Sequence, residues 1–349
     1  MKVGILGDCH FGARSDLTLF HTHFERFYEY FFNWLDELDI KQVIQLGDLF
    51  DRRKYVNFST LSESRRYFFD RLRDRGISMV TLLGNHDLYY RDITTVSSSD
   101  LLLRDYSNIT VVTQPSTMVF DTTSIDIIPW ICSDNEHQVS DFIAKSKSDL
   151  CVGHFEIENF HMYKGVEAHG GMRADAFAKY ERVLSGHYHT RSERDNITYV
   201  GTPYEMTWQD YNDPKGFHVF DTDSRQLTFF ENPNRIFIRL EYHDADQSTL
   251  DALDLKDCFV KVVVTSKQDL YKFDQYVQKL YNKGCYEIKI IEDMSEFSDG
   301  EIGEDIDLED TMDVLSNYID SIDTDANKDK IKQFMKGLYV EAVNQSVVD

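Results

Sequence analysis

Five short polar motifs, four of them opened by glycine, constrain the fold of this chain more than any other feature. In order they are Asp8-Cys9-His10, Gly47-Asp48-Leu49-Phe50-Asp51, Gly84-Asn85-His86-Asp87, Gly153-His154 and Gly186-His187-Tyr188-His189. Each follows a short apolar run that predicts a β-strand. Loops at the carboxyl ends of strands are where an α/β sheet presents its ligands, and glycine lets the backbone turn sharply there. The motifs therefore predict one polar site at the edge of an α/β fold.

The rest of the first 233 residues alternates strand and helix patterns. Strands are predicted at 3–6, 42–46 and 78–83, separated by helices over about 24–38 and 60–75. Further strands follow more closely at 109–112, 117–120, 125–128, 150–153, 182–185, 198–200, 217–221 and 226–231, with one helix near 139–145. This order predicts a second, mixed sheet stacked on the first, which gives a β-sandwich flanked by helices.

The pattern changes after residue 233 to strand, helix, strand, helix, strand, at 236–242, 248–253, 259–265, 270–281 and 287–291. We expect a main domain over 1–233, a small α+β capping domain over 234–291, an acidic linker over 292–310 and C-terminal helices over 311–349. The last helix carries one apolar stripe, formed by Ile331, Phe334, Met335, Leu338 and Ala342. Such a stripe docks either on the small domain or in a groove of a partner protein.

Charge is distributed unevenly along the chain. The formal net charge is −24, but residues 291–325 carry fourteen acidic side chains and no basic one. Residues 52–75 have eight Lys or Arg against three Asp or Glu, which makes a local stretch of net +5 beside the second motif. The phosphates of nucleic acids are bound by Lys and Arg side chains, and this stretch supplies them. The negative net charge therefore does not exclude an enzyme that acts on nucleic acid.

The N-terminal apolar run and the cysteines bear on the compartment. Val3 to Leu6 is too short for a signal peptide or a membrane span, so we expect a cytoplasmic protein with no membrane contact. The five cysteines form no CxxC pair, which indicates reduced, packed thiols that form neither disulfides nor a cysteine zinc site.

The five motifs supply carboxylate, imidazole and amide donors, and the residues expected to bind include no sulfur. This donor set suits Mn²⁺, Fe or Zn²⁺, whereas an all-oxygen set would favour Mg²⁺ or Ca²⁺. An isolated histidine is more often structural than a ligand, but five of the twelve histidines fall within these motifs. The count suffices for two ions if one carboxylate bridges them, and two ions about 3.5–4 Å apart can clamp a phosphate.

The ordered set D-x-H, GDxxD, GNHD, GH and GHxH resembles the signature of calcineurin-like metallophosphoesterases. Longer stretches resemble the SbcD and Mre-eleven group of DNA-repair nucleases, including its phage-encoded exonuclease subunits: IDIIPWI at 125–131, CVGHFEIENFHMYKGVEAHGG at 151–171 and YVGTPYEMTWQDYNDPKGFHVFD at 199–221. The resemblance spans essentially the whole chain. It implies a DNA exonuclease on duplex ends, with endonuclease action on single strands. It also implies a partner, an SMC-like ATPase of the Rad-fifty or SbcC type, in recombination, repair and replication.

The resemblance also implies roles for individual residues. One divalent ion would be held by Asp8, His10, Asp48 and His189, and the other by Asp48, Asn85, His154 and His187. The ions would be Mn²⁺, with Mg²⁺ possible in vitro, and a hydroxide between them would attack the phosphodiester. His86, supported by Asp87, would protonate the leaving 3′ oxygen.

The same resemblance gives expectations for DNA and for assembly. DNA contacts are expected from Arg52, Arg53, Lys54, Tyr163, Lys164 and His169. The C-terminal helices would bind the ATPase, and helices at 60–75 and 99–106 would pair two subunits into a homodimer.

Two alternatives stay open from the sequence. GDLFDRR partly matches a phosphatase pattern, so the chain could be a phosphomonoesterase or protein phosphatase on the same fold, or a scaffold without activity. The motif GNHD, the small domain and the basic stretch favour the nuclease. Cellular relatives have GDLFH where this chain has GDLFD, so we expect Asp51 either to orient a ligand or to cap its loop.

Overall fold

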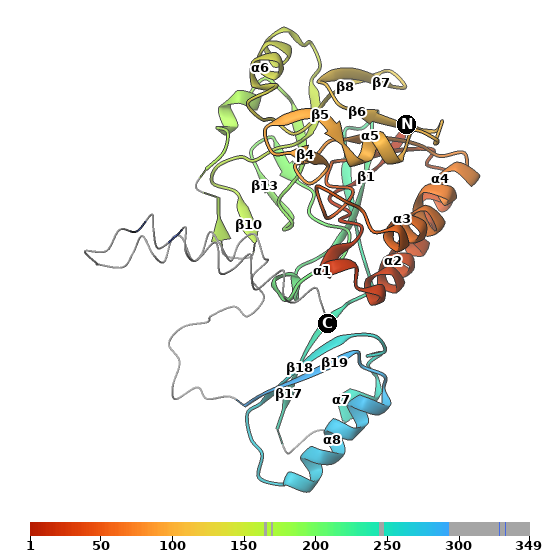
Figure 1. Ribbon diagram of the computed structural model, residues 1–349, viewed down its shortest axis with the longest axis vertical. Coiled ribbons are helices and arrows are strands. Elements are labelled where there is room, and N and C mark those ends of the chain that lie inside the picture. Colours follow the sequence, from red (N-terminus) through yellow and green to blue (C-terminus); the bar gives the residue numbers. More distant parts are fainter. Residues whose placement is uncertain (164–165, 169, 244–247, 293–327, 329–331, 333–349) are drawn as a thin grey trace. The chain divides into compact units, whose positions relative to one another are not determined.

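Two six-stranded sheets, both within the described residues, form the body of the computed structural model (Figure 1). The structure describes residues 1–163, 166–168, 170–243, 248–292, 328 and 332. The chain divides into two compact units, Met1–Asp293 and Met294–Asp349, and both sheets belong to the first. The expected C-terminal helices over 311–349, with their apolar stripe, lie outside the described residues apart from Lys328 and Lys332. The expected linker over 292–310 also lies outside them after Glu292.

The first sheet has the strand order β16-β15-β1-β2-β3-β6. Its strands are β1 (Lys2–Leu6), β2 (Gln42–Gln45), β3 (Ser78–Leu82), β6 (Ile109–Val112), β15 (Gly216–Asp221) and β16 (Leu227–Glu231). β1, β2, β3 and β6 are parallel, and β15 pairs antiparallel with both β1 and β16. Because β1, β2 and β3 run in one direction, the first three motifs leave the sheet at the same edge.

The second sheet has the order β13-β14-β12-β9-β8-β7. Its strands are β7 (Ser116–Phe120), β8 (Thr123–Ile128), β9 (Leu150–His154), β12 (Arg182–Gly186), β13 (Ser192–Arg194) and β14 (Ile197–Tyr199). The four inner strands are parallel, whereas β7 and β13 are antiparallel edges. The last two motifs begin at the carboxyl ends of β9 and β12, so this sheet also presents its polar loops at one edge.

A shared apolar core holds the two sheets together. Ile5 and Ile44 of the first sheet are buried in one cluster with Ile127, Val152 and Leu184 of the second. Each of these side chains is at most 4% exposed. The sandwich predicted from the strand pattern is therefore confirmed, and its core fixes the loops of one sheet against those of the other.

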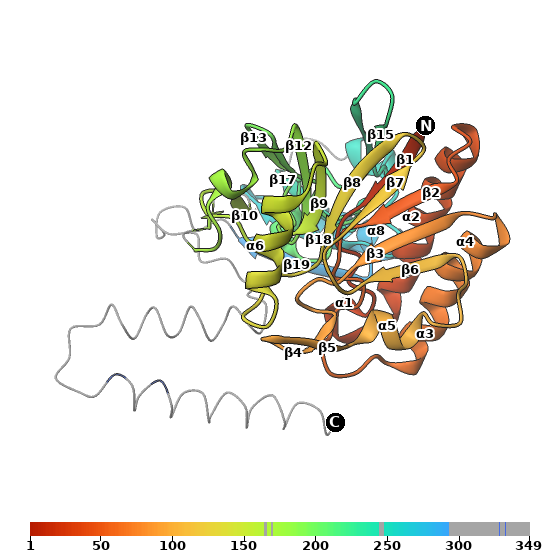
Figure 2. The ribbon, with the colours of Figure 1, turned by 90° about the horizontal axis from the view of Figure 1, so that it is seen from above.

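Helices cover the outer faces of the sandwich (Figure 2). On the first sheet lie α1 (Ala13–Asp16), α2 (Thr18–Glu37), α3 (Phe58–Ser64), α4 (Asp70–Asp74) and α5 (Ser98–Leu102). In α2, Phe24, Phe27, Phe31 and Leu35 are buried, and the Phe24 ring stacks on the Tyr204 ring with 3.9 Å between the ring centroids. On the second sheet, α6 (Glu136–Lys145) buries Val139 and Ile143 against Phe155.

The helix expected over 60–75 contains an irregularity. A π-helical turn over Arg65–Phe69 joins α3 to α4. The turn places three consecutive aromatic residues, Tyr67, Phe68 and Phe69, in buried positions. A π turn rotates the following side chains relative to a regular α-helix. Three consecutive residues can therefore be buried here, whereas a regular α-helix would turn one of them toward solvent.

Two hairpins outside the main sheets were not expected from the sequence, and neither was the edge strand β13. β4 (Leu88–Tyr90) pairs with β5 (Ile93–Ser97) directly after the third motif. β10 (His161–Tyr163) pairs with β11 (Val166–Glu167) after the fourth. The short strands of the hairpins lie outside both six-stranded sheets. Apolar residues of β4 and β5 such as Tyr90 and Ile93 are exposed. The run of buried apolar residues from which the longer strands were predicted is therefore missing.

A further sheet follows residue 236 in the described part of the chain. β17 (Phe237–Tyr242), β18 (Phe259–Val264) and β19 (Glu287–Glu292) are parallel, connected by α7 (Ser248–Asp251) and α8 (Leu270–Asn282). The predicted element order is thus confirmed. At the start of β17, Oε2 of buried Glu205 accepts hydrogen bonds from the amides of Ile236 and Phe237, at 2.6 and 2.9 Å.

The cysteines match the expectation of reduced thiols, because all five, each in the described part of the chain, are free. Among the described residues, no helix has both the length and the apolar character needed to cross a membrane.

Candidate metal centre

The five motifs meet at the edge where both sheets present their loops. The loops after β1, β2 and β3 supply Asp8, His10, Asp48 and Asn85, and those after β9 and β12 supply His154, His187 and His189. Three groups of possible ligand atoms result, with the atoms of each within 4.8 Å of one another. Two consist of expected ligands: the first group is Asp8 with His10 and His189, and the second is Asp48 with His154 and His187. The remaining one is His10 with Asp51 and His86. All seven ligands expected from the sequence therefore lie in one place.

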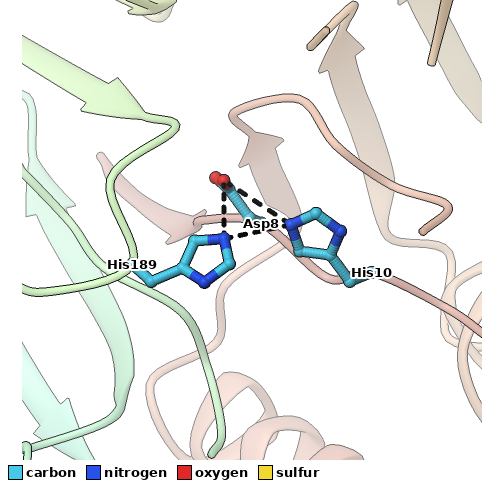
Figure 3. Close-up of side chains that lie close together, drawn as sticks. All are labelled: Asp8, His10 and His189. Atoms are coloured by element: carbon cyan, nitrogen blue, oxygen red, sulfur yellow. Dashed lines mark hydrogen bonds and ion pairs between the residues drawn. The ribbon is translucent and has the colours of Figure 1, made fainter. Parts of the chain in front are cut away.

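The first group joins loops from the two sheets (Figure 3). Nε2 of His10 lies 3.2 Å from Nε2 of His189, and Oδ2 of Asp8 lies 4.0 Å from each of these nitrogens. The three side chains point toward one another, so one cation could contact all of them. The Asp8 carboxylate is held in place because both of its oxygens accept from the amide of His187 at 3.0 Å.

The side-chain oxygen of Asn85, the remaining expected ligand, lies beside the two histidines of the second group. Oδ1 of Asn85 lies 3.0 Å from Nε2 of His154 and 3.1 Å from Nδ1 of His187. Nδ1 of His154 donates to the Leu46 carbonyl at 2.7 Å, which leaves Nε2 of that ring free of a proton in the neutral tautomer. An unprotonated imidazole nitrogen fixed by a hydrogen bond on the other side is the usual form of a metal ligand.

Asp48 belongs to the second group and also faces the first. Its Oδ2 is 3.3 Å from Nε2 of His154 and 3.9 Å from Nε2 of His10. Its Oδ1 accepts from the amide of His86 at 2.7 Å, so the rotation of the carboxylate is restricted. One oxygen of Asp48 thus faces both groups.

The charges in the centre are strongly perturbed. Burial raises the pKa of Asp8 to about 6, and the charge of Asp48 adds to the rise. Burial alone would lower the pKa of His154, but the charges of Asp48 and Asp8 raise it to about 9. Burial, together with His10, lowers the pKa of His189 to about 3. Without cations, the buried carboxylates draw protons onto His10, whose pKa is also raised to about 9, and onto His154. Positive charge is therefore favoured in this centre, and two divalent cations that replace these protons would supply it.

Backbone conformation at the centre is unusual. His10, Asp48 and His187 have φ angles of 43°, 52° and 88°. These values lie in the left-handed region, which residues other than glycine rarely adopt. Such conformations gather at functional sites, where the surrounding structure holds them. A Cβ at Gly84 would lie 2.1 Å from Oδ1 of Asp48, so only glycine allows this approach.

Asp87 has partners other than the expected one. Its buried carboxylate accepts from the amides of Asp48 and Gly84 at 2.9 Å each and from the Ser99 hydroxyl at 2.9 Å. Within the described residues, no hydrogen bond joins it to the His86 ring. The expected support of His86 by Asp87 is therefore corrected: Asp87 ties the second motif to the third.

Asp51 takes the place beside the histidines instead. Nδ1 of His86 donates to the Asp51 carbonyl at 2.5 Å, and Oδ1 of Asp51 lies 3.4 Å from Nδ1 of His10. The His10 and His86 rings are themselves in edge contact at 4.9 Å. Of the two roles expected for Asp51, this geometry favours the orientation of a ligand.

The residues expected to contact DNA are only partly described. Arg52, Arg53 and Lys54 follow Asp51 directly, and the Arg52 guanidinium lies 5.1 Å from the Tyr55 ring. Tyr163 ends β10, whereas Lys164 and His169 lie outside the described residues.

The remainder of the basic stretch over 52–75 is largely paired. Arg66 forms ion pairs with Glu25 and Glu63, and Arg75 lies 3.3 Å from Asp36. These acidic partners come mostly from α2. Within the described residues, the basic side chains of the stretch that form no ion pair are Arg52, Arg53, Lys54, Arg65 and Arg71, and the first three directly follow the second motif.

Lys215, which lies behind the first group, was not expected from the sequence. Its buried ammonium is 2.7 Å from Oδ1 of Asp210, 2.8 Å from Oδ2 of Asp213, and donates to the carbonyl of His189 at 2.8 Å. Burial lowers the pKa of Lys215, but the two aspartates raise it above its usual value. A lysine with two aspartates within six positions was the only signal in the sequence, and such spacing is common on surfaces.

Replacing Lys215 by methionine should weaken both the fold and the first metal group. The change leaves Asp210 and Asp213 buried without a cation, which costs about 3–5 kcal/mol, and releases the His189 carbonyl. The variant Lys215→Met with Asp210→Asn and Asp213→Asn should regain stability in thermal denaturation but still bind Mn²⁺ more weakly in calorimetric titration. Wild-type Mn²⁺ affinity in that stable triple variant would contradict the positioning role of Lys215.

Comparison with known proteins agrees with this site. Residues 1–191 match the family model "Calcineurin-like phosphoesterase". The chain belongs to this family, and it is a metal-dependent phosphodiesterase of the nuclease type. It is 32% identical over 345 residues to "Exonuclease subunit 1" of Enterobacteria phage T4, an alignment that covers 98% of this chain and 99% of the relative. The resemblance to the SbcD and Mre-eleven group is confirmed.

Solved structures give a more distant likeness. A novel archaeal phosphodiesterase is 11% identical with a TM-score of 0.35, and covers 66% of this chain and 100% of its own. A hypothetical protein from Thermus thermophilus is 14% identical with a TM-score of 0.37, and covers 67% of this chain and 100% of its own. At these TM-scores neither adds to the family assignment.

Proposed function

We propose that this chain is a two-metal DNA nuclease in which Asp48 bridges the ions. The observation that carries the proposal is the position of Asp48 Oδ2 between the two ligand groups. One ion would be held by Asp8, His10, Asp48 and His189, and the other by Asp48, Asn85, His154 and His187. Because four of the seven ligands are imidazoles, Mn²⁺ suits the centre better than Mg²⁺, which prefers oxygen.

The protein's own groups have separate tasks in this proposal. When bound, two divalent cations supply Lewis-acid charge to the phosphate and lower the pKa of a bound water. His86 binds no ion, and its Nδ1 is occupied by the Asp51 carbonyl, so Nε2 is the ring atom that can deliver a proton. It would protonate the leaving 3′ oxygen. Asp87 keeps the loops of Asp48 and His86 in register.

The substrate would be a DNA strand that approaches across the loops. Support comes from the relative, an exonuclease subunit of a phage, whose likeness covers nearly the whole of this chain. It also supports action in the cytoplasm of a host cell. Arg52, Arg53, Lys54, Tyr163, Lys164 and His169 are the proposed DNA contacts. Residues 1–233 would form the nuclease domain and residues 234–291 its cap.

A direct assay separates this function from phosphatase activity. The protein with Mn²⁺ should degrade linear duplex DNA and be inactive with chelator, and it should hydrolyse a phosphomonoester far more slowly. His86→Ala should lower turnover roughly 10²- to 10⁴-fold, the range for general acid–base groups, with unchanged metal content by elemental analysis. His243→Ala, at an exposed histidine, is the matched control. Faster cleavage of the monoester, or loss of metal from His86→Ala, would contradict the proposal.

We also propose a complex with an SMC-like ATPase of the Rad-fifty or SbcC type, with two nuclease subunits. The relative's description as a subunit supports a partner, and the apolar stripe of the last predicted helix supports docking through residues 311–349. For the pairing of two subunits, support comes from exposed Phe58 on α3 and Leu101 on α5, which are 88% and 53% exposed. The π-helical turn that follows α3 adjoins the end of α5, since Arg65 donates to the Leu102 carbonyl at 3.1 Å.

Truncation after Asp310 tests this assembly. Light scattering of the full chain with the ATPase should give a mass that contains two nuclease subunits. The truncated chain should lose the ATPase but keep its melting temperature and its Mn²⁺-dependent activity. If it unfolds or aggregates, the C-terminal residues belong to the core of the nuclease and the docking proposal fails. A single nuclease subunit in the complex would contradict pairing.

A further inference from the structure

A cavity of about 290 Å³ opens beside the second ligand group. It lies between α6, the carboxyl end of β9 and the segment around residues 171–172. Its walls include Trp130, Glu136, Ser140, His154, Glu156 and Met172. The volume is at the lower limit of the roughly 300–1,000 Å³ of small-molecule pockets, so it holds one small ring system and not several nucleotides.

The cavity shares a wall with the metal centre. The Trp130 ring lies 5.8 Å from the His154 ring and 5.1 Å from the His187 ring, centroid to centroid. Its backbone amide donates to the Leu83 carbonyl at 2.7 Å, at the end of β3. A group in the cavity would therefore lie next to a phosphate held at the second ligand group.

Three polar side chains of the cavity, Glu136, Ser140 and Glu156, have no partner among the described residues. Glu136 and Glu156 are exposed, and neither carboxylate forms a hydrogen bond or ion pair with any described residue. The same holds for the hydroxyl of Ser140 among the described residues. Beneath them, Val139 and Phe155 are buried in an apolar cluster. An apolar floor with a few unpartnered polar groups is the usual composition of a ligand pocket.

The charge of these groups selects the ligand. Two carboxylates repel a phosphate, so the sugar–phosphate backbone is excluded from the cavity. They accept hydrogen bonds from amino and ring N–H groups, which nucleobases present on their edges. Trp130 offers an aromatic face of the kind on which single bases stack. The uncharged, donor-bearing part of a nucleotide is its base.

We infer that this cavity receives the nucleobase of the nucleotide whose phosphate is cleaved, with Trp130, Glu136 and Glu156 as its recognition groups. The inference rests on the proposed nuclease function. It makes the enzyme dependent on an unstacked base at the cleavage position, in addition to the phosphate. Bases with exocyclic amino groups would be preferred over thymine.

Two duplex substrates test the inference, one with a normal terminal nucleotide and one with a tetrahydrofuran abasic residue in its place. The wild-type ratio of kcat/KM, normal over abasic, should be roughly 5- to 150-fold, as expected for one stacked base. Ser140→Phe, which fills the cavity, and the double variant Glu136→Gln with Glu156→Gln should bring this ratio toward one. Gln138→Phe on the same helix and Glu181→Gln, both exposed and outside the cavity, should keep the wild-type ratio.

A binding measurement separates this inference from the nuclease function. With chelator present, deoxyadenosine should quench tryptophan fluorescence saturably in the wild type but not in Ser140→Phe. A wild-type ratio of one, or equal ratios in all variants, overturns the base pocket while DNA cleavage itself continues. If no DNA is cleaved at all, the nuclease proposal fails. If deoxyadenosine then quenches the fluorescence of Ser140→Phe as strongly as that of the wild type, the base pocket is overturned as well.

Discussion

The buried carboxylate of Asp48 faces histidines from three different loops, and the arrangement of the centre depends on this contact. Its Oδ2 lies within 4 Å of both His10 and His154, one from each sheet. A buried carboxylate without positive partners is costly, so the loops of both sheets are stable together only when cations or protons balance it. Asp87 adds to the constraint, because it accepts from the amide of Asp48 and from that of Gly84.

The sandwich core gives this contact its rigidity. The expected ligands come from the carboxyl ends of β1, β2 and β3 in one sheet and of β9 and β12 in the other, and the apolar cluster between the sheets fixes their separation. Lys215 adds a second connection, because its ammonium joins Asp210 and Asp213 to the carbonyl of His189. A small shift of the apolar cluster or of Lys215 would move the expected ligand atoms by tenths of an ångström. Metal coordination tolerates such displacements poorly.

Much of this could be predicted from the sequence, for reasons of local pattern. Strands of apolar residues followed by glycine and a polar residue are signals within a few positions, and the seven expected ligands do lie together. Contacts between distant positions left no such signal. Arg66 forms an ion pair with Glu25 of α2. Asp87 accepts from backbone amides and not from the His86 ring. The buried ammonium of Lys215 donates to the His189 carbonyl. The β4–β5 hairpin was missed because Leu88 is the one apolar residue of its two strands that is buried, so no apolar face marks it.

Anomalous diffraction from crystals grown with Mn²⁺ tests the central claim most directly. The account predicts two manganese peaks, one on each side of Asp48 Oδ2. One should be bound by Asp8, His10 and His189, and the other by Asn85, His154 and His187. A single peak, or two peaks that share a ligand other than Asp48, would contradict it.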